Sequence, residues 1–325
     1  MNLRSLVAGS GGYLPRRVLT NDEISKTVDT NDEWIRERTG IRERRIAADG
    51  ELTSDLAVQA AEAAMSDAGV AAADIDLIIV ATTTPDKTFP ATAAIVQAKL
   101  GVDKGAAFDV QAVCSGFLFA LTTADNFLRA GAHKRALVIG AETFSRIVDW
   151  TDRATCVLFG DGAGAVVLEA TELNGDTLAA RGVITTEILT DGRLANLLHV
   201  DGGVSSTGTA GHVRMQGNRL FRQAVERISS AMVTVGKRAG VAPSDVDWFV
   251  PHQANERILN GVVEKLGLKR DRVVSTIAEQ GNTSAASIPL AYAAARQDGR
   301  IKDGDLVMIE ALGGGLTWGA ALFRA

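Results

Sequence analysis

Cys114 is the residue of this chain best placed for covalent chemistry. It lies in the segment 108–116, where a strand-like run meets small residues, and an apolar helix is predicted over 117–130. A thiol at the start of a helix faces free backbone N–H groups and the positive end of the helix dipole, which favour the nucleophilic thiolate. The alternative is a small buried apolar residue, which is our interpretation of Cys156.

His252 and Asn282 are candidate hydrogen-bonding partners for such a nucleophile. His252 follows a strand predicted over 246–250 and precedes a helix, and ligand sites of α/β sheets lie at the carboxyl ends of strands. Asn282 lies among small residues before an apolar helix, a setting that also suits a helix cap. The other histidines have no comparable setting and are interpreted as surface or structural residues: His133, His199 and His212.

Two glycine-rich segments of the chain resemble loops that have known functions in other proteins. Gly313, Gly314 and Gly315 follow a strand predicted over 306–310, and such a run makes a tight turn or lets a backbone N–H approach a carbonyl oxygen, as in an oxyanion hole. The segment 160–164 has the wrong spacing for a nucleotide loop, and a strand follows it. A dinucleotide site is therefore not expected.

The elements that must position these residues occur twice along the chain. An Ala-Gly-Val-Ala turn and the apolar strand after it, residues 68–81, match residues 239–252. A Lys-Leu-Gly sequence at 99–101 matches one at 265–267, in the same order. The sequence therefore predicts two related halves packed face to face.

This repeat relates the candidate residues to one another. Counted from the matched leucines, Cys114 and Asn282 occupy nearly the same position in the two halves. A pseudo-twofold arrangement would bring them together at the joint, with His252 at a strand end nearby.

Short apolar strands alternate with amphipathic helices such as those predicted over 54–68 and 220–239, which indicates an α/β fold with buried sheets. We predict a first half with the nucleophilic cysteine at 1–172 and a second half with the histidine and asparagine at 216–325. Residues 173–215, rich in Gly, Thr and Asp, have no counterpart in the second half and are predicted to be a partly irregular insertion at a substrate entrance.

The composition argues against several classes of protein. The formal net charge of −5 offers no basic surface for nucleic acid. No apolar stretch is long enough to span a bilayer, and residues 1–15 lack the zones of a signal peptide, so a cytoplasmic protein without membrane contact is expected. The two cysteines belong to no CxxC pair or histidine cluster, which predicts reduced thiols and no metal site.

Together these segments resemble the 3-oxoacyl-(acyl-carrier-protein) synthase III family of the thiolase superfamily, from the first strand to the last residue. Besides the segments of Cys114, His252 and Asn282, the similarity includes residues 32–35, 38–42, 160–164 and 313–315. The resemblance implies the thiolase fold, in which two pseudo-symmetric halves form a five-layer αβαβα arrangement. It also implies a homodimer and a Cys-His-Asn catalytic site.

The family initiates type II fatty-acid synthesis. The resemblance implies that Cys114 accepts the acyl group of a short acyl-CoA, expected to be acetyl-CoA, while the N–H groups of Cys114 and Gly314 hold the oxyanion. Malonyl-acyl-carrier protein then loses carbon dioxide, and its carbanion attacks the acyl-cysteine to give 3-oxoacyl-carrier protein. His252 and Asn282 would donate hydrogen bonds to the enolate. No metal or redox cofactor is implied, and coenzyme A enters as a thioester substrate.

The resemblance also assigns binding residues. Trp34, Arg38 and Arg153 fall at coenzyme A contacts, where an indole stacks on adenine and guanidinium groups meet phosphate; a half-buried tryptophan with solvated arginines is the alternative. Phe89 resembles the residue that closes the acyl pocket across the dimer, and an aromatic ring there suggests short primers.

A local excess of basic residues suits an acidic carrier protein. Between residues 214 and 238 the sequence has six arginines and lysines against the single acid Glu226, and Arg257 follows His252 closely. Carrier docking is therefore predicted at Arg222, Arg257 and Lys265, although Glu264 stands where family members often have a second basic residue. A solvated helix face is the alternative.

The sequence was also weighed against other functions of related enzymes, and some of them fit it better than others. A thiolase would need a second catalytic cysteine near the carboxyl terminus, and residues 313–325 contain none. An elongating synthase would have a histidine in place of Asn282, and hydroxymethylglutaryl-CoA synthase would need a catalytic glutamate that the sequence does not place. A related condensing enzyme or acyltransferase of secondary metabolism with another primer is the closest rival. The alternative outside the enzymes is a non-catalytic protein that binds acyl carriers.

Overall fold

The computed structural model describes residues 3–173 and 175–325. Two β-sheets run through it. The strands of the first sheet, in spatial order, are β1 (Leu3–Tyr13), β7 (Gly162–Glu172), β6 (Arg135–Glu142), β4 (Leu77–Ala81) and β5 (Ala106–Val110). Those of the second are β8 (Gly182–Thr190), β13 (Thr317–Arg324), β12 (Leu306–Gly313) and β11 (Trp248–Pro251).

The two sheets repeat one pattern of pairing. In each, a parallel pair (β4 with β6, β11 with β12) continues through two antiparallel pairings to an outer strand, β1 or β8. The fifth strand, β5, has as its counterpart only a single parallel bridge between Phe249 and Val273. The predicted internal repeat is therefore present in three dimensions.

One part of the predicted organisation is wrong. β8 lies inside residues 173–215, which were expected to form an insertion, yet it pairs with β13 along its length as an outer strand of the second sheet. Its sequence has three consecutive polar residues, Thr185, Thr186 and Glu187, between apolar ones, so it lacks the continuous apolar run that marked the other strands. The second sheet therefore begins well before residue 216, and an entrance role is retained only for the stretch 191–215.

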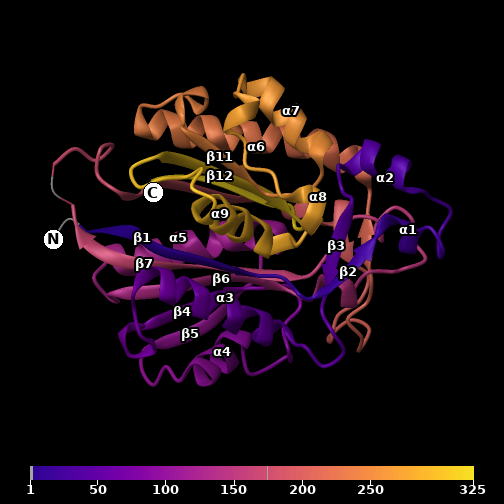
Figure 1. Ribbon diagram of the computed structural model, residues 1–325, viewed down its shortest axis with the longest axis horizontal. Helices are drawn as coiled ribbons and strands as arrows, with labels where there is room; N and C mark the ends of the chain where they lie inside the picture. The colour runs from indigo at the N-terminus through magenta and orange to yellow at the C-terminus, as the bar shows by residue number, and fades with distance from the viewer. Residues whose placement is uncertain (1–2, 174) are drawn as a thin grey trace.

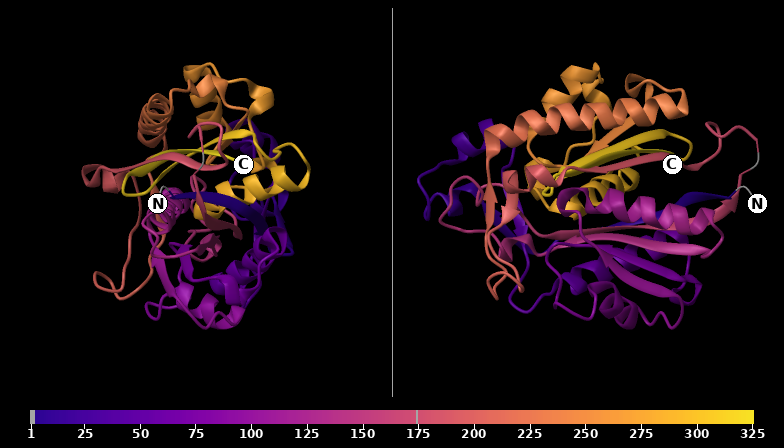
Figure 2. Two further views of the ribbon diagram at one scale, coloured as in Figure 1. Left: turned by 90° about the vertical axis from the view of Figure 1, so that its left-hand side faces the viewer. Right: turned by 180° about the vertical axis from the view of Figure 1, so that it is seen from behind.

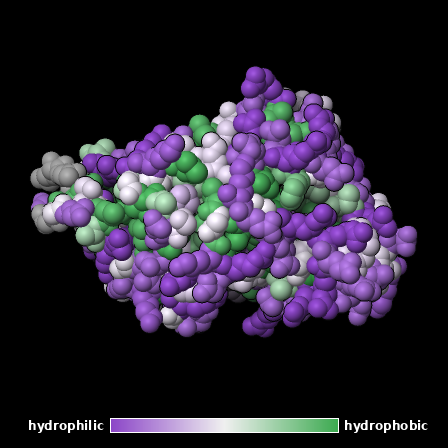
Figure 3. Space-filling model, turned by 90° about the horizontal axis from the view of Figure 1, so that it is seen from above, coloured by the Kyte–Doolittle hydropathy of each residue, from purple (hydrophilic) through white to green (hydrophobic). Residues whose placement is uncertain are grey.

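Helices lie on both outer faces and between the sheets (Figures 1 and 2). α3 and α4 cover the first sheet, α6 and α7 cover the second, and α5 and α9 lie between the two, which confirms the five-layer αβαβα arrangement. The bounds are α3 (Thr53–Ala68), α4 (Thr92–Leu100), α5 (Gly116–Arg129), α6 (Gly217–Ala239), α7 (Glu256–Leu266) and α9 (Ser287–Gln297). Seen from the side of α6 and α7, hydrophilic side chains cover most of the rim and apolar ones show in the middle (Figure 3). No helix within 3–173 and 175–325 has the length and apolarity needed to cross a membrane.

Smaller elements gather at one end of the layers (Figure 1). They are β2 (Arg17–Thr20), α1 (Asn21–Ile24), α2 (Asp32–Thr39), β3 (Glu43–Ile46), α8 (Ile277–Gln280) and the hairpin β9 (Leu198–Val200) with β10 (Val213–Met215). The fully buried Arg44 of β3 connects β2 and β3 to the segment before β7. Its guanidinium group donates to the carbonyl oxygens of Leu19 (3.1 Å) and Val157 (2.7 Å). Asn31 caps α2 by accepting from the Trp34 N–H at 2.8 Å.

The two inner helices begin in the same unusual way. A 3₁₀ turn precedes each, Val113–Ser115 before α5 and Ser284–Ala286 before α9. The first residue of each turn has a positive φ, 49° at Val113 and 51° at Ser284. This conformation is strained, most of all for a β-branched residue, so surrounding contacts must maintain both turns.

The halves approach most closely where these turns meet β6. An added Cβ on Gly140 would overlap the carbonyl oxygen of Ala285 and lie 3.2 Å from the Ala286 Cα. Since both neighbours are backbone atoms, only glycine fits at this position without moving one half against the other.

We therefore expect Gly140→Ala to destabilise the fold by about 3 kcal/mol through overpacking, and to weaken catalysis because the turn of Ser284 must shift. Thermal and urea unfolding would measure the first effect. Gly192→Ala is the matched control, since Gly192 has no atom within 4 Å of an added Cβ and no positive φ. Equal stability of the two variants would contradict the close approach.

Candidate active site

Cys114, His252 and Asn282 line one cavity of about 280 Å³. Each is nearly buried, with 3%, 3% and 5% of its surface exposed. They come from the start of α5, the end of β11 and the segment before α9, so the site spans the joint between the halves. The structure thus brings together the three residues singled out in the sequence.

Cys114 lies in the strained turn before α5, and the glycine-rich segment packs directly on it. An added Cβ on Gly313 would lie 2.7 Å from the Cys114 backbone nitrogen. Ser115 and Thr317 share a hydroxyl contact of 2.6 Å, and Thr317 Oγ1 also donates to the Ala112 carbonyl at 2.9 Å. The last two strands therefore support the turn that contains Cys114.

The resting form of Cys114 is the thiol. Burial raises its pKa to about 12, and a hydrogen bond with Ser284 lowers it only in part. The sequence had indicated that the helix start would favour the thiolate, but the desolvation of a charged sulfur outweighs it. Since the thiolate is the nucleophilic form, Cys114 must lose its proton before or during attack.

His252 is held by its backbone and by one ring nitrogen. Its N–H donates to the Glu310 carbonyl at 2.8 Å, and its Nδ1 lies 2.6 Å from Ser287 Oγ. Its Nε2 is buried and has no partner among the described residues. Burial lowers the pKa of His252 to about 3, so the imidazole is neutral at physiological pH.

Asn282 is fixed so that its amide nitrogen remains available. Its backbone bridges to Phe159, donating to the Leu158 carbonyl (2.9 Å) and accepting from Gly160 N–H (3.0 Å). Its Oδ1 accepts from the Ser284 N–H at 2.9 Å, while Nδ2 has only a long contact of 3.5 Å to the Ala254 carbonyl. The donor side of the amide is thus free for a ligand.

The structure refines the predicted symmetry between the halves. Matching the two 3₁₀ turns places Ala285, and not Asn282, opposite Cys114. Asn282 lies three residues earlier, in the loop that leads into the turn.

An indole with two guanidinium groups close to its ring forms part of the cavity wall. The Arg38 and Arg153 guanidinium carbons lie 4.5 and 5.0 Å from the Trp34 ring centroid, and Arg153 also donates to the Asp29 carbonyl at 2.8 Å. All three side chains, with the exposed Arg257, line the cavity that contains Cys114. The three predicted coenzyme A contacts are therefore neighbours.

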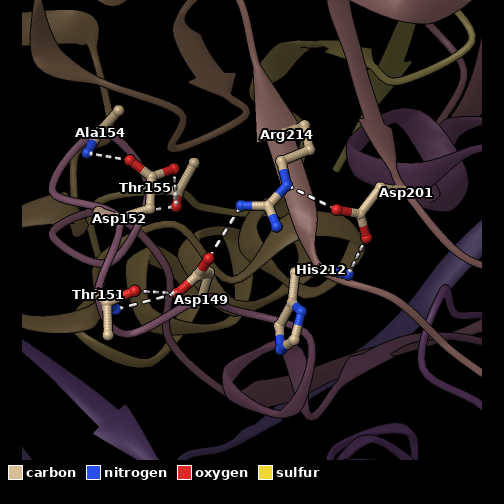
Figure 4. A network of polar contacts seen from close by, with 8 residues as sticks. All are labelled: Asp149, Thr151, Asp152, Ala154, Thr155, Asp201, His212 and Arg214. Carbon is tan, nitrogen blue, oxygen red and sulfur yellow. Dashed lines mark hydrogen bonds and ion pairs between the residues drawn. The ribbon is translucent and has the colours of Figure 1, made fainter.

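A polar network holds the hairpin β9–β10 against the segment that carries Arg153 (Figure 4). Arg214 donates to Asp149 Oδ2 at 2.9 Å and to Asp201 Oδ2 at 2.7 Å. Asp201 also accepts from the His212 N–H at 2.7 Å. The Thr151 hydroxyl and the Arg214 guanidinium hold the pKa of Asp149 well below its usual range, so the network is ionised at neutral pH.

Other predicted residues lie away from the cavity. Phe89 is 83% exposed, and Arg222 and Lys265 are exposed on α6 and α7 without lining the cavity. Lys265 pairs with Glu226, the one acid counted in the basic stretch. Carboxylates from other segments pair with three more of its basic residues: Arg214, Arg227 and Arg238. The local basic excess is therefore smaller than the sequence indicated.

Sequence reasoning missed four polar residues around the site. Ser287 contacts His252, Ser284 contacts Cys114, and the fully buried Glu142 contacts Ser284. Glu310 lines the cavity with an unpartnered Oε2, and burial raises its pKa to about 8. An available signal was a glutamate within or ending an apolar strand, which is unexpected unless paired or functional.

Comparisons with known proteins agree with this geometry. Residues 108–192 match the family model described as 3-oxoacyl-[acyl-carrier-protein (ACP)] synthase III, and residues 237–325 match the model of its C-terminal part. The beta-ketoacyl-[acyl-carrier-protein] synthase III of Hyphomonas neptunium is 62% identical over 324 residues, covering 100% of each chain. That of Bradyrhizobium diazoefficiens is 62% identical over 322 residues, covering 99% of each.

A solved structure supports the same assignment. The crystal structure of 3-oxoacyl-[acyl-carrier-protein] synthase III from Aquifex aeolicus superposes with a TM-score of 0.92 at 48% identity, over 99% of this chain and 100% of that one. The fold, the position of the cysteine and full-length identity of this degree lead to one conclusion: this chain belongs to the 3-oxoacyl-[acyl-carrier-protein] synthase III family.

Proposed function

We propose that this protein condenses a short acyl-CoA, with acetyl-CoA as the expected primer, with malonyl-acyl-carrier protein, as the initiating step of type II fatty-acid synthesis. The observation that carries the proposal is the meeting of a thiol, a neutral imidazole and a free amide donor in one cavity that Trp34, Arg38 and Arg153 also line. The products are 3-oxoacyl-carrier protein, coenzyme A and carbon dioxide.

In the first step the Cys114 sulfur attacks the carbonyl carbon of the acyl thioester. A new carbon–sulfur bond forms, the old one breaks, and the proton lost from the Cys114 thiol balances the proton that the departing coenzyme A thiolate takes up. The backbone N–H groups of Cys114 and Gly314 would hold the oxyanion. The close packing of the glycine segment on the Cys114 backbone supports this assignment.

In the second step the malonyl carboxylate leaves as carbon dioxide and its electron pair passes into the thioester enolate. His252 Nε2 and Asn282 Nδ2 would donate to the enolate oxygen. This role assigns the ring hydrogen to Nε2, so that Nδ1 accepts a hydrogen bond from Ser287 Oγ, which lies 2.6 Å away. The carbanion then attacks the acyl-cysteine and expels the Cys114 thiolate. These steps need no metal or redox cofactor, since decarboxylation drives the condensation.

We assign coenzyme A to the part of the cavity lined by Trp34, Arg38 and Arg153. There the indole offers a stacking face and the guanidinium groups offer phosphate contacts. The clamp of Arg214 on Asp149 and Asp201 supports the segment of Arg153.

We further propose that the carrier protein docks near Arg257 and Arg222. Both are exposed, and no carboxylate of residues 3–173 or 175–325 forms an ion pair with either. Lys265 is retained as a weaker contact because Glu226 must release it.

A second copy of the chain would complete the acyl pocket. The exposed Phe89 side chain and the outer position of β5 at the sheet edge support a homodimer that covers both. We also propose a cytoplasmic location, and the net charge of −5 supports the absence of nucleic-acid contact.

The reaction can be tested by mass spectrometry of the intact protein. After mixing with a panel of acyl-CoAs, we expect a mass gain on Cys114 for short primers, followed by its discharge as 3-oxoacyl-carrier protein when malonyl-carrier protein is added. No gain with any short acyl-CoA would favour an enzyme of secondary metabolism or a non-catalytic carrier-binding protein.

Substitutions should separate the two steps. Cys114→Ala should abolish condensation and keep malonyl decarboxylation. His252→Ala and Asn282→Ala should keep acylation of Cys114 and lose decarboxylation by about 100-fold or more, because one oxyanion donor is removed in each. Acyl-enzyme mass and carbon dioxide release would be measured separately. Full condensation by either the His252 or the Asn282 variant would contradict the roles given.

Removing the indole should weaken coenzyme A binding selectively. Trp34→Ala is expected to raise KM for acyl-CoA about tenfold, equal to about 1.4 kcal/mol, and to leave decarboxylation of malonyl-carrier protein unchanged. Trp248→Ala is the control, because Trp248 also contacts an arginine, Arg272 at 5.8 Å, but does not line the cavity. The same KM change in both variants would argue against a coenzyme A contact at Trp34.

A further inference from the structure

Ser287 is the first residue of α9, and none of its surface is exposed. Its Oγ lies 2.6 Å from His252 Nδ1 and 3.3 Å from the backbone nitrogen of Gln253. Within residues 3–173 and 175–325 these are the two hydrogen-bond contacts of the hydroxyl. One buried hydroxyl is therefore shared between the histidine ring and the neighbouring backbone amide.

The direction of these two hydrogen bonds follows from the atoms involved. The Gln253 N–H can only donate, so Ser287 Oγ accepts from it. The serine hydroxyl has one hydrogen of its own, and His252 Nδ1 is the only acceptor within its reach in the described part of the chain. If Nδ1 carried the ring hydrogen, the buried Ser287 hydrogen would have no acceptor, which is costly. Ser287 therefore donates to Nδ1.

The opposite nitrogen of the ring then carries the hydrogen. Burial lowers the pKa of His252 to about 3, so the imidazole is neutral and has a single N–H, at Nε2. Nε2 has no partner among the described residues, and His252 lines the cavity together with Cys114 and Asn282. The one N–H of the ring is thus left for a ligand of this cavity.

A buried glutamine fixes the main chain next to His252. The Gln253 side chain has no exposed surface, and its Nε2 donates to the Pro251 carbonyl at 2.8 Å. Its Oε1 accepts from the Thr276 N–H at 2.8 Å, which ties the end of β11 to the residue before α8. The backbone N–H that faces Ser287 is therefore held in place, and the serine hydrogen remains directed to the ring.

We propose that Ser287 is a positioning residue that keeps His252 in the tautomer with its hydrogen at Nε2, and so sets the donor for the thioester enolate. Ser287 does not line the cavity itself and acts through His252. This inference rests on the proposed function, because it concerns the decarboxylation step.

The role involves no proton transfer. As the malonyl carboxylate leaves as carbon dioxide, its electron pair passes into the enolate, and the hydrogen bond from Nε2 strengthens as the oxygen gains charge. The charge returns to carbon when the new carbon–carbon bond forms. The Nε2–H bond stays intact throughout, so the histidine and the serine are unchanged after each turnover.

The opposite tautomer would affect only one of the two steps. It would place a lone pair at Nε2, which repels the enolate oxygen. Acylation of Cys114 is assigned to backbone N–H groups and does not use this nitrogen. A defect at Ser287 should therefore separate decarboxylation from acylation.

The direct test is ¹⁵N NMR of the full-length protein labelled at its four histidines, at neutral pH and without substrate. The signal that disappears in His252→Ala belongs to His252. We expect the hydrogen at Nε2 in the unaltered protein and in Ser287→Thr, which keeps the hydroxyl. Ser287→Ala should leave both tautomers populated, because the donor to Nδ1 is lost.

Activity gives a second readout. Ser287→Ala should lower kcat for malonyl decarboxylation about tenfold, less than removal of the donor itself, and leave acylation of Cys114 unchanged. The double variant with His252→Ala should decarboxylate no more slowly than His252→Ala alone, because the serine acts through the histidine. Ser229→Ala is the matched control, since Ser229 is also buried but its hydroxyl has no partner among the described residues.

Three results would overturn the proposal: a hydrogen at Nδ1 in the unaltered protein, an unchanged tautomer in Ser287→Ala, or an equal loss of acylation and decarboxylation in that variant. If Ser287→Ala does not fold, the tautomers of the unaltered protein and of Ser287→Thr still decide, and a hydrogen at Nδ1 in either contradicts the proposal. The NMR measurement uses no acyl-CoA or carrier protein. Failure of the proposed condensation would therefore be seen separately, as a lack of decarboxylation in the unaltered protein.

Discussion

The fold and the site both depend on close contact between the two halves at the starts of α5 and α9. At this joint the backbone of one half lies so near that of the other that Gly140 has no room for a side chain. Two strained turns, at Val113 and Ser284, are maintained there by contacts from the other half or from the last strands. The polar atoms buried at the joint must then find partners in one another, and those partnerships define the chemistry.

The sequence was sufficient to predict site residues whose neighbours along the chain indicate a strand end or a helix start. Cys114, His252 and Asn282 lie at strand ends or helix starts, and the internal repeat indicated that they meet. Ser284, Ser287 and Glu142 could not be found in this way, because a serine among small residues and a glutamate after an apolar strand have many ordinary explanations. Their roles depend on which atoms face each other across the joint.

The errors have physical causes as well. β8 was missed because three consecutive polar residues, Thr185, Thr186 and Glu187, interrupt its apolar run, so that its sequence resembles a loop. The basic stretch of α6 was overvalued because its counterions come from distant segments, such as Asp191 for Arg227 and Glu187 for Arg238. Charge counted along a chain does not measure charge on a surface.

The ion pairs of Arg214 with Asp149 and Asp201 depend on pH. The pKa values of both carboxyl groups are lowered in the folded protein, so the stability that these ion pairs contribute is lost as pH falls below the range of an ordinary carboxyl.

Matching the two turns places Ala285 opposite Cys114. A duplicated framework offers two equivalent places for a nucleophile, and in this chain one of them has a methyl group in place of a thiol. The molecule is therefore symmetric in architecture and asymmetric in chemistry: in the proposed reaction one half carries the covalent intermediate, and the other supplies hydrogen-bond donors to the same site. In that reaction each chain would hold a single acyl group at a time, because only one of the two equivalent positions has a thiol.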